Sequence, residues 1–260
     1  MPDTFFTDGD AYERLMGRWS RAVGEVFLDW LALPNGLNWL DVGCGTAAFT
    51  ELVLSRCAPV QMRAIDPSED QIAFARKRPG TSGVTFRVGD AQALPYDDRE
   101  FDAAAMALVI SFIPDPAKAV AEMKRVVKPG GMVGTYMWDS LGGGFVQQPL
   151  LNALEAMNVE VPPSPARRNS RIAELRGFFE TAGFDQVATR AIEIEVSYAN
   201  FDEYWASQTG LANPAVQAIR KMSGPDVERL RANLRAQLPI RNGRIAYPAR
   251  ANAVKGRVPG

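Results

Sequence analysis

The sequence contains no histidine, and its two cysteines, Cys44 and Cys57, do not form a metal-binding pair. The lack of histidine excludes the Ser-His-Asp and Cys-His hydrolytic sites and the usual zinc sites. Any general base must then be an Asp, Glu, Tyr, Lys or Cys side chain. With so few cysteines we expect no metal and a reducing, cytoplasmic setting.

Long apolar runs and an excess of one charge are also missing. No stretch approaches the ~20 apolar residues that cross a bilayer, and the first residues, MPDTFFTDGDAY, lack the features of a secretion signal. The formal net charge of −1 gives no general attraction to nucleic acid or anionic lipid. We therefore expect no nucleic-acid partner and no membrane partner. The length of 260 residues fits one large domain with or without a cap.

What is present is an alternation of strands and helices. Apolar residues at three- and four-residue spacing predict a first helix over Tyr12–Leu33. The strands expected after it are Leu37–Leu40, Val60–Ile65, Val84–Val88, Phe101–Val109 and Met132–Trp138. The helices between them are Thr46–Cys57, Ser68–Arg78 and Asp115–Val127, the last ending at Lys128-Pro129-Gly130-Gly131. This order predicts an α/β fold with a doubly wound, mostly parallel sheet.

The pattern is looser after Asp139. The expected elements there are helices at Gln148–Asn158 and Ile172–Thr181, a strand at Val187–Val196, two or more helices within Phe201–Leu238 and a last strand at Arg244–Lys255. Pro248 marks an edge or a bulge in that last strand. We interpret the late helices as a cap over the carboxyl edge of the sheet, where ligands bind in open α/β folds.

Candidate binding residues follow successive strands. The turn Gly43-Cys44-Gly45 follows the first strand, and Asp66 ends the second, about 20 residues beyond the turn, where an acid accepts hydrogen bonds from a ribose diol in nucleotide-binding units. Asp90-Ala91 follows the third strand, and Met106–Phe112 lies at the end of the fourth. All of them face one crevice if the sheet is doubly wound.

These segments resemble a known family. LDVGCGTAAF, AIDPSEDQI, RVGDAQALPY, FDAAAMALVISFIPDP and KPGGMV together are similar to the class I S-adenosylmethionine-dependent methyltransferases, and most of all to the type 11-like group related to ubiquinone and small-molecule methyltransferases. The resemblance covers residues 36–138 well. YERLMGRWSR, MWD, FDEYW and PARANAVKG resemble a bacterial branch of the family without indicating a substrate. The resemblance to class I methyltransferases implies a Rossmann-like seven-stranded sheet with helical cap insertions.

The resemblance implies a role for each matching residue toward S-adenosylmethionine, with S-adenosylhomocysteine as the product. The methionine part would meet Asp41, Gly43, Cys44, Gly45 and the backbone carbonyls of Met106 and Ala107. Asp66 would accept from both ribose hydroxyls, Pro67 would flank the adenine, and Asp90 with Ala91 would meet the adenine amino group. In the first helix, Tyr12 or Trp19 would close over the cofactor, although Trp19 is equally suited to the core.

The acceptor side is less defined. Asp139 is the candidate for a substrate-facing acid or general base, and a turn cap is its alternative role. The candidate pocket residues, each of which also suits a core position, are Phe112, Trp138, Tyr204 and Trp205. We divide the chain into a helix over the cofactor site (1–35), a cofactor-binding core (36–139) and the rest of the sheet with a substrate cap (140–260). We expect a small-molecule acceptor and a monomer or homodimer.

Several alternatives stay open. Ala47 stands where the family commonly has glycine, and we expect helical dihedral angles there, which suit alanine and leave cofactor binding intact. A cofactor-binding module without catalysis is one alternative function. An NAD(P)-dependent oxidoreductase is another, because Gly43-x-Gly45-x-x-Ala48 fits the loose dinucleotide pattern. A nucleic-acid methyltransferase is disfavoured, because Ala107-Leu108-Val109-Ile110 is apolar where such an enzyme has a polar element.

Overall fold

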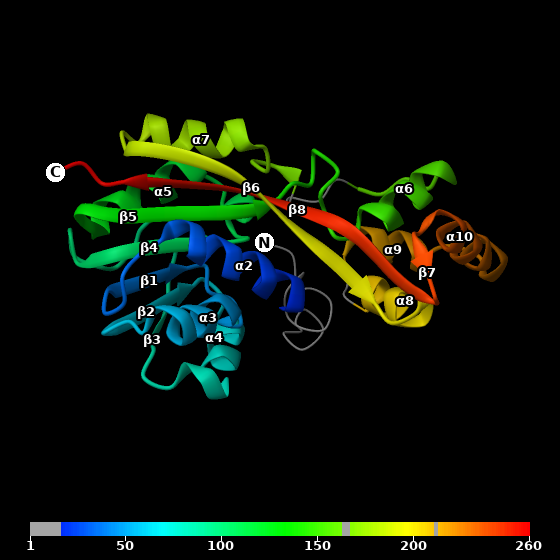
Figure 1. The fold of residues 1–260 in the computed structure, drawn as a ribbon, viewed down its shortest axis with the longest axis horizontal. Helices are drawn as coiled ribbons and strands as arrows, with labels where there is room; N and C mark the ends of the chain where they lie inside the picture. The colour runs from blue at the N-terminus through cyan, green and yellow to red at the C-terminus, as the bar shows by residue number, and fades with distance from the viewer. Residues whose placement is uncertain (1–16, 163–166, 211–212) are drawn as a thin grey trace.

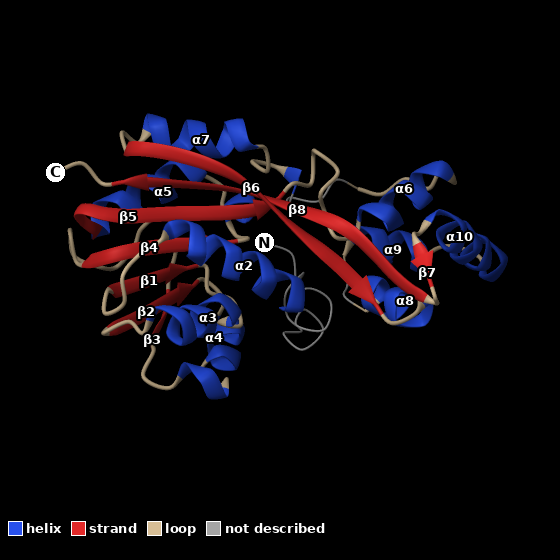
Figure 2. Ribbon diagram, viewed as in Figure 1, coloured by secondary structure: helices blue, strands red, loops and turns tan. Residues whose placement is uncertain are grey.

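A twisted sheet runs through the molecule, with strand order β3-β2-β1-β4-β5-β8-β6 (Figures 1 and 2). The computed structural model describes residues 17–162, 167–210 and 213–260. The strands are β1 Asn38–Val42, β2 Gln61–Asp66, β3 Thr85–Val88, β4 Phe101–Ala107, β5 Val127–Trp138, β6 Asp185–Tyr198, β7 Ile240–Arg241 and β8 Arg244–Arg257. β1 to β5 are parallel, whereas β8 is antiparallel to both β5 and β6 and also pairs with the short β7. The predicted mostly parallel α/β sheet is confirmed, but among the described residues it has eight strands rather than seven, because the short β7 pairs with β8.

Helices cover both faces of the sheet. On one face lie α2 (Arg18–Leu31), α3 (Ala48–Cys57) and α4 (Glu69–Ala75), and on the other lie α5 (Pro116–Val126) and α7 (Ile172–Thr181) (Figure 1). An aromatic cluster holds the first face, where the Phe27 ring lies 4.8 Å from Tyr136 and 6.1 Å from Phe49. β4 is almost wholly apolar because it is covered on both sides.

Two predicted helix starts are confirmed by their caps. The Ser68 side chain accepts from the backbone N–H of Gln71, and the Asp115 carboxylate accepts from that of Lys118. A side-chain oxygen at the N-cap satisfies a backbone donor that the helix itself leaves open. These caps fix where each crossover helix begins after its strand.

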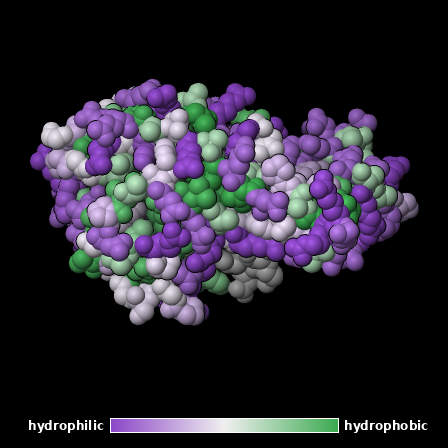
Figure 3. Space-filling model, viewed as in Figure 1, coloured by the Kyte–Doolittle hydropathy of each residue, from purple (hydrophilic) through white to green (hydrophobic). Residues whose placement is uncertain are grey.

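A helical lobe lies beyond the carboxyl end of β5. The long strands β6 and β8 run past that end, and α6 (Gln148–Ala156), α8 (Phe201–Thr209), α9 (Pro214–Arg220) and α10 (Gly224–Gln237) gather around them (Figure 1). The pairing of β5 with β8 ends where Trp138 lies opposite Ala251. Pro248 lies beyond that point and is paired with β6 alone. Its missing N–H therefore removes no hydrogen bond between β8 and β5. On the face shown in Figure 3, hydrophilic residues cover most of the surface and a hydrophobic area lies where the lobe meets the main body.

Some predicted boundaries are wrong. Residues Lys128 to Gly131 belong to β5 rather than to a loop, because Gly130 and Gly131 exchange backbone hydrogen bonds with Val258. β4 ends at Ala107 rather than Val109, because Leu108 has φ of +61° and leaves the extended region. The part of the predicted first helix before residue 17, including Tyr12, lies outside the described residues. Among the described residues, no helix is long and apolar enough to cross a membrane.

Candidate active site

The turn after β1 carries the glycine pair at the carboxyl edge of the sheet. Gly43 and Gly45 have φ of +74° and +50°, and the N–H groups of Gly43 and Cys44 both donate to the Ile65 carbonyl of β2. A Cβ on Gly43 would lie 2.5 Å from a methyl of Val109, whereas one on Gly45 would meet nothing closer than 4.0 Å. Gly43 is therefore required by packing, and Gly45 leaves open space beside the backbone.

Ala47 adopts a left-handed conformation, with φ of +65° and ψ of +27°, as the residue before α3. The expectation of helical angles at this position is therefore wrong. The turn imposes the conformation, since the Ala47 N–H donates to the Cys44 carbonyl at 2.8 Å and the side chain is fully buried. An alanine in this region costs on the order of 1–2 kcal/mol, a cost that glycine does not incur.

Ala47→Gly is expected to raise the free energy of unfolding by about 1 kcal/mol, because glycine adopts the left-handed conformation without strain. Urea denaturation of both proteins measures the difference. Ala119→Gly is the matched control: Ala119 is buried inside α5, where glycine should cost about 1 kcal/mol. If both variants lose stability equally, the conformation assigned to Ala47 is wrong.

Asp66, the last residue of β2, ties this turn to the next helix. One carboxylate oxygen accepts from the Gly45 N–H and the other from the Ser68 N–H, each at 2.9 Å. Burial raises the pKa of Asp66, and the two backbone hydrogen bonds oppose that rise. Each oxygen keeps lone-pair capacity for a further donor, as the predicted ribose contact requires.

Asp41 lies in β1 beside the turn and is almost fully buried. One oxygen, Oδ2, accepts from the Thr50 hydroxyl at 2.6 Å, and Oδ1 has no hydrogen-bond partner among the described residues. Burial, and to a smaller extent repulsion from Asp66, raises the pKa of Asp41 to about 7 against the lowering effect of Thr50. The sequence reasoning did not single out Thr50, although a polar residue among the buried positions of α3 was a signal for it.

The other predicted cofactor residues lie near the same edge. Asp90 is exposed and accepts from the backbone and side-chain N–H groups of Gln92, and Ala91 beside it is buried. Pro67 is exposed just beyond Asp66. At the end of β4, the Met106 carbonyl accepts from the Thr135 hydroxyl at 2.7 Å and Ala107 is half-buried. Met106 therefore has one lone pair already engaged, and its predicted contact with the cofactor stays a prediction.

The aromatic candidates divide into separate environments. Trp19 of α2 packs edge-on against Tyr198 of β6 at 5.9 Å, and Tyr204 of α8 packs against the same ring at 5.2 Å. The Trp19 Nε1 and the Tyr204 hydroxyl are both buried and have no partner among the described residues. Trp205 instead stacks on Phe201, under the guanidinium of Arg231 from α10. The structure thus groups Trp19 with Tyr204 and separates Trp205 from them.

Asp139 follows β5 and forms an ion pair with Arg250 of β8. Its Oδ2 accepts from Arg250 Nε at 2.8 Å, and its Oδ1 accepts from the Gly142 N–H at 3.0 Å. The carboxylate is nearly buried and closes the glycine-rich loop that follows. These contacts favour the turn-cap role over the predicted catalytic one. Trp138, the last residue of β5, is buried, and Phe112 is 38% exposed.

Asp139→Asn is expected to lower the free energy of unfolding by about 1–2 kcal/mol, since the charge that Arg250 pairs with is lost. Arg250→Gln should give a similar loss if the pair only holds the loop. Catalytic turnover of the folded Asn variant should stay within a few-fold of that of the unchanged protein. A drop of about 10² or more with cofactor binding intact would instead identify Asp139 as a general base.

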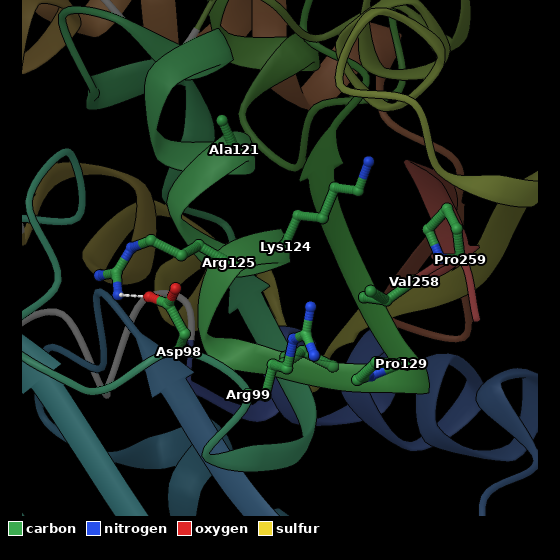
Figure 4. A pocket seen from close by; sticks show the side chains of 9 residues that line it. Asp98, Arg99, Ala121, Lys124, Arg125, Pro129, Val258 and Pro259 are labelled. Atoms are coloured by element: carbon green, nitrogen blue, oxygen red, sulfur yellow. Dashed lines mark hydrogen bonds and ion pairs between the residues drawn. The ribbon is translucent and has the colours of Figure 1, made fainter.

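A separate cavity of about 390 Å³ lies at the opposite, amino edge of the sheet (Figure 4). It is lined at the start of β5 by Val127 and Pro129 and at the end of β8 by Val258, with the side chains of Arg99 and Lys124 beside them. The glycine turn and Asp66 lie at the other ends of their strands, so this cavity is not part of the candidate site. Among the described residues, no cluster of Cys, Asp and Glu could hold a metal ion.

Comparison with known proteins gives a family match for part of this chain. A model of the methyltransferase domain matches residues 40–134, which hold the glycine turn, Asp66, Asp90 and Met106. Residues 40–134 are thus similar to a methyltransferase domain. The match contains every predicted cofactor residue except Tyr12 and Trp19 of the first predicted helix, and it goes against the dinucleotide-dependent oxidoreductase alternative.

The relatives of this domain include quinone-pathway enzymes. A demethylmenaquinone methyltransferase from Desulfitobacterium hafniense is 39% identical over 103 residues, which are 38% of this chain and 41% of that protein. A ubiquinone/menaquinone biosynthesis C-methyltransferase from Dinoroseobacter shibae is 28% identical over 202 residues, 70% of this chain and 80% of that protein. The first of these matches spans less than half of the relative, so likeness there is limited to the methyltransferase domain.

Solved structures share the fold of the methyltransferase domain and lobe. The YcgJ protein from Bacillus subtilis is 19% identical with a TM-score of 0.59, covering 92% of this chain and 98% of that chain. A phosphoethanolamine N-methyltransferase from Haemonchus contortus, solved with S-adenosylhomocysteine, is 17% identical with a TM-score of 0.57, covering 96% of this chain and 56% of that chain. At these identities the likeness establishes the class I methyltransferase fold alone.

Proposed function

We propose that this chain transfers a methyl group from S-adenosylmethionine to a small-molecule acceptor at the carboxyl edge of its sheet. The observation that carries the proposal is the joint position of Asp41, the Gly43–Gly45 turn and Asp66. The turn presents open backbone, Asp66 has lone pairs left over, and Asp41 has a buried oxygen without a partner among the described residues. Such an oxygen is costly unless a ligand or water satisfies it.

The residues present fit the proposed cofactor. Asp66 would hold the ribose diol, Asp90 and Ala91 the adenine, and Asp41 with the glycine turn the methionine part. The bound cofactor supplies a sulfonium methyl that is already activated for in-line displacement. The work left to the protein is to align the two reactants and exclude water, and alignment alone contributes on the order of 7–11 kcal/mol. A base is needed only for a hydroxyl or a carbon acid, and then it is not a histidine.

The acceptor side of the proposed site lies between α2 and the helical lobe. Trp19 from α2 and Tyr204 from α8 meet there on Tyr198, and both contribute a buried polar atom without a partner among the described residues. Arg18 joins the same parts, donating to the Ser197 carbonyl and pairing with Glu203. We therefore assign α2 and the lobe as the cover of the reaction chamber.

The first test is calorimetric titration with S-adenosylmethionine and S-adenosylhomocysteine, with NAD as control. Micromolar binding of the two sulfur nucleosides alone is expected. Binding of NAD instead, or of neither sulfur nucleoside, overturns the proposal.

The acceptor is then sought with labelled S-adenosylmethionine and a panel of small molecules. A demethylated menaquinone is the first to try, because one relative is named a demethylmenaquinone methyltransferase and another a ubiquinone/menaquinone biosynthesis C-methyltransferase. Transfer to any panel member supports an enzyme. Cofactor binding without transfer to any member favours the non-catalytic binding module, and transfer only to DNA or RNA contradicts a small-molecule acceptor.

A further inference from the structure

The buried pair of Asp41 and Thr50 links β1 to the first turn of α3 behind the glycine turn. Both side chains are inaccessible to solvent, and the Thr50 hydroxyl donates to Asp41 Oδ2 at 2.6 Å. This bond fixes the carboxyl rotamer and occupies one oxygen. The other oxygen, Oδ1, has no partner among the described residues and is the free acceptor of the pair.

We propose that Thr50 is a positioning residue for the cofactor: its hydroxyl holds the Asp41 carboxyl so that Oδ1 is available to the cationic methionine end of S-adenosylmethionine. The inference rests on the proposed function. A hydrogen bond from a neutral donor to a carboxylate favours the charged form, so Thr50 acts on the protonation of Asp41 as well as on its orientation. Binding to a protonated site then releases one proton from Asp41 to solvent.

The surroundings of Asp41 leave Thr50, through its hydroxyl first and its backbone second, to favour the charged form of the carboxyl. β2 presents Asp66, which repels the ionised form, and the paired residue on β4 is Ala105, which offers no charge. The turn presents the Cys44 thiol, whose pKa burial raises well above its ordinary range, so it stays neutral. Among the described residues no cation is paired with Asp41, and Thr50 provides the contacts that lower its pKa.

Thr50→Val removes the hydroxyl while keeping the shape of the side chain. The loss of one hydrogen bond to a charged group should raise the pKa of Asp41 from about 7 by about one unit. If only the ionised form binds, S-adenosylmethionine affinity falls about fivefold at pH 7 and is about unchanged at pH 9. Thr50→Ser retains the hydroxyl and should follow the pH profile of the unchanged protein.

The experiment is calorimetric titration from pH 6 to pH 9 for the unchanged protein and the variants, repeated in two buffers to count the released proton. Thr81→Val is the matched control, because Thr81 is a buried threonine that donates to the Ala75 and Arg78 carbonyls elsewhere. Equal loss at every pH, or a Ser variant as weak as the Val variant, overturns the role of Thr50. Failure of the unchanged protein to bind at any pH instead rejects the proposed function.

Discussion

Asp66→Ala is expected to weaken S-adenosylmethionine binding by about 10² or more, which is the largest single loss we anticipate in this site. Each ribose hydroxyl that donates to the carboxylate contributes ~1.5–3 kcal/mol, and two hydroxyls are available. The variant also loses the anchors of the Gly45 and Ser68 N–H groups, so the turn is held less firmly. Calorimetric titration measures the affinity, and circular dichroism shows that the variant is folded.

The contribution of the ribose contact can be distinguished from the effect of the loosened turn by changing the ligand as well as the protein. A cofactor analogue without ribose hydroxyls lacks the contact in both proteins, so its affinity should fall in the variant only by the effect of the loosened turn, which is much less than the fall for S-adenosylmethionine. Asp185→Ala is the control, since Asp185 is an exposed acid at the opposite edge of the sheet. Unchanged cofactor affinity in a folded Asp66→Ala variant would falsify the ribose role.

Asp41→Asn is expected to stabilise the folded protein at pH 8 while weakening cofactor binding. Asp41 has a pKa of about 7 in the folded chain against 3.8 in the unfolded chain. Between those values the folded state holds a proton that the unfolded state releases, so stability falls as pH rises through this window and levels off above pH 7. The buried charge therefore costs about 2–4 kcal/mol at pH 8, a cost that the neutral asparagine removes.

Urea denaturation at pH 4.5, 6 and 8 measures this effect. The gain from Asp41→Asn should be smallest at pH 4.5, where Asp41 is protonated in the folded chain, and largest at pH 8. The chain has no histidine, so none titrates within this window and obscures the slope. Asp185→Asn serves as the control for a surface acid. The same stability difference at every pH would mean that Asp41 is not a buried, proton-binding carboxyl. A gain in stability at the expense of ligand binding is typical of substitutions in functional sites.

Local sequence patterns were sufficient to predict the helices and strands and the order in which the candidate site residues follow the strands. Helix Ile172–Thr181 was predicted with its observed bounds, because its apolar spacing and the following Gly183 are local signals. The N-caps at Ser68 and Asp115 were also readable, since each cap involves residues only three positions apart. Asp66 was placed at its strand end for the same reason, although its contacts with a cofactor stay a prediction.

Contacts between residues far apart in the sequence could not be predicted from local patterns. Ala47 is left-handed because the turn is tied to β2 through Ile65, and alanine's own helix preference indicated the opposite. The two roles left open for Asp139, a substrate-facing acid and a turn cap, could not be weighed from the sequence, because its partner Arg250 lies over a hundred residues away on the antiparallel β8. Trp205 was grouped with Tyr204 by adjacency, yet neighbouring residues on a helix point in different directions.

The sequence by itself determined the alternation that makes the sheet, the glycine turn and the acids at the strand ends, because each is encoded within a short segment. The tertiary structure alone decided which of those acids are free to act. Asp139 is engaged by Arg250, Asp66 is held by two backbone donors, and Asp41 retains an oxygen beside Thr50 with no partner among the described residues. The physical reason is that charge, burial and hydrogen-bond supply depend on neighbours that only folding brings together.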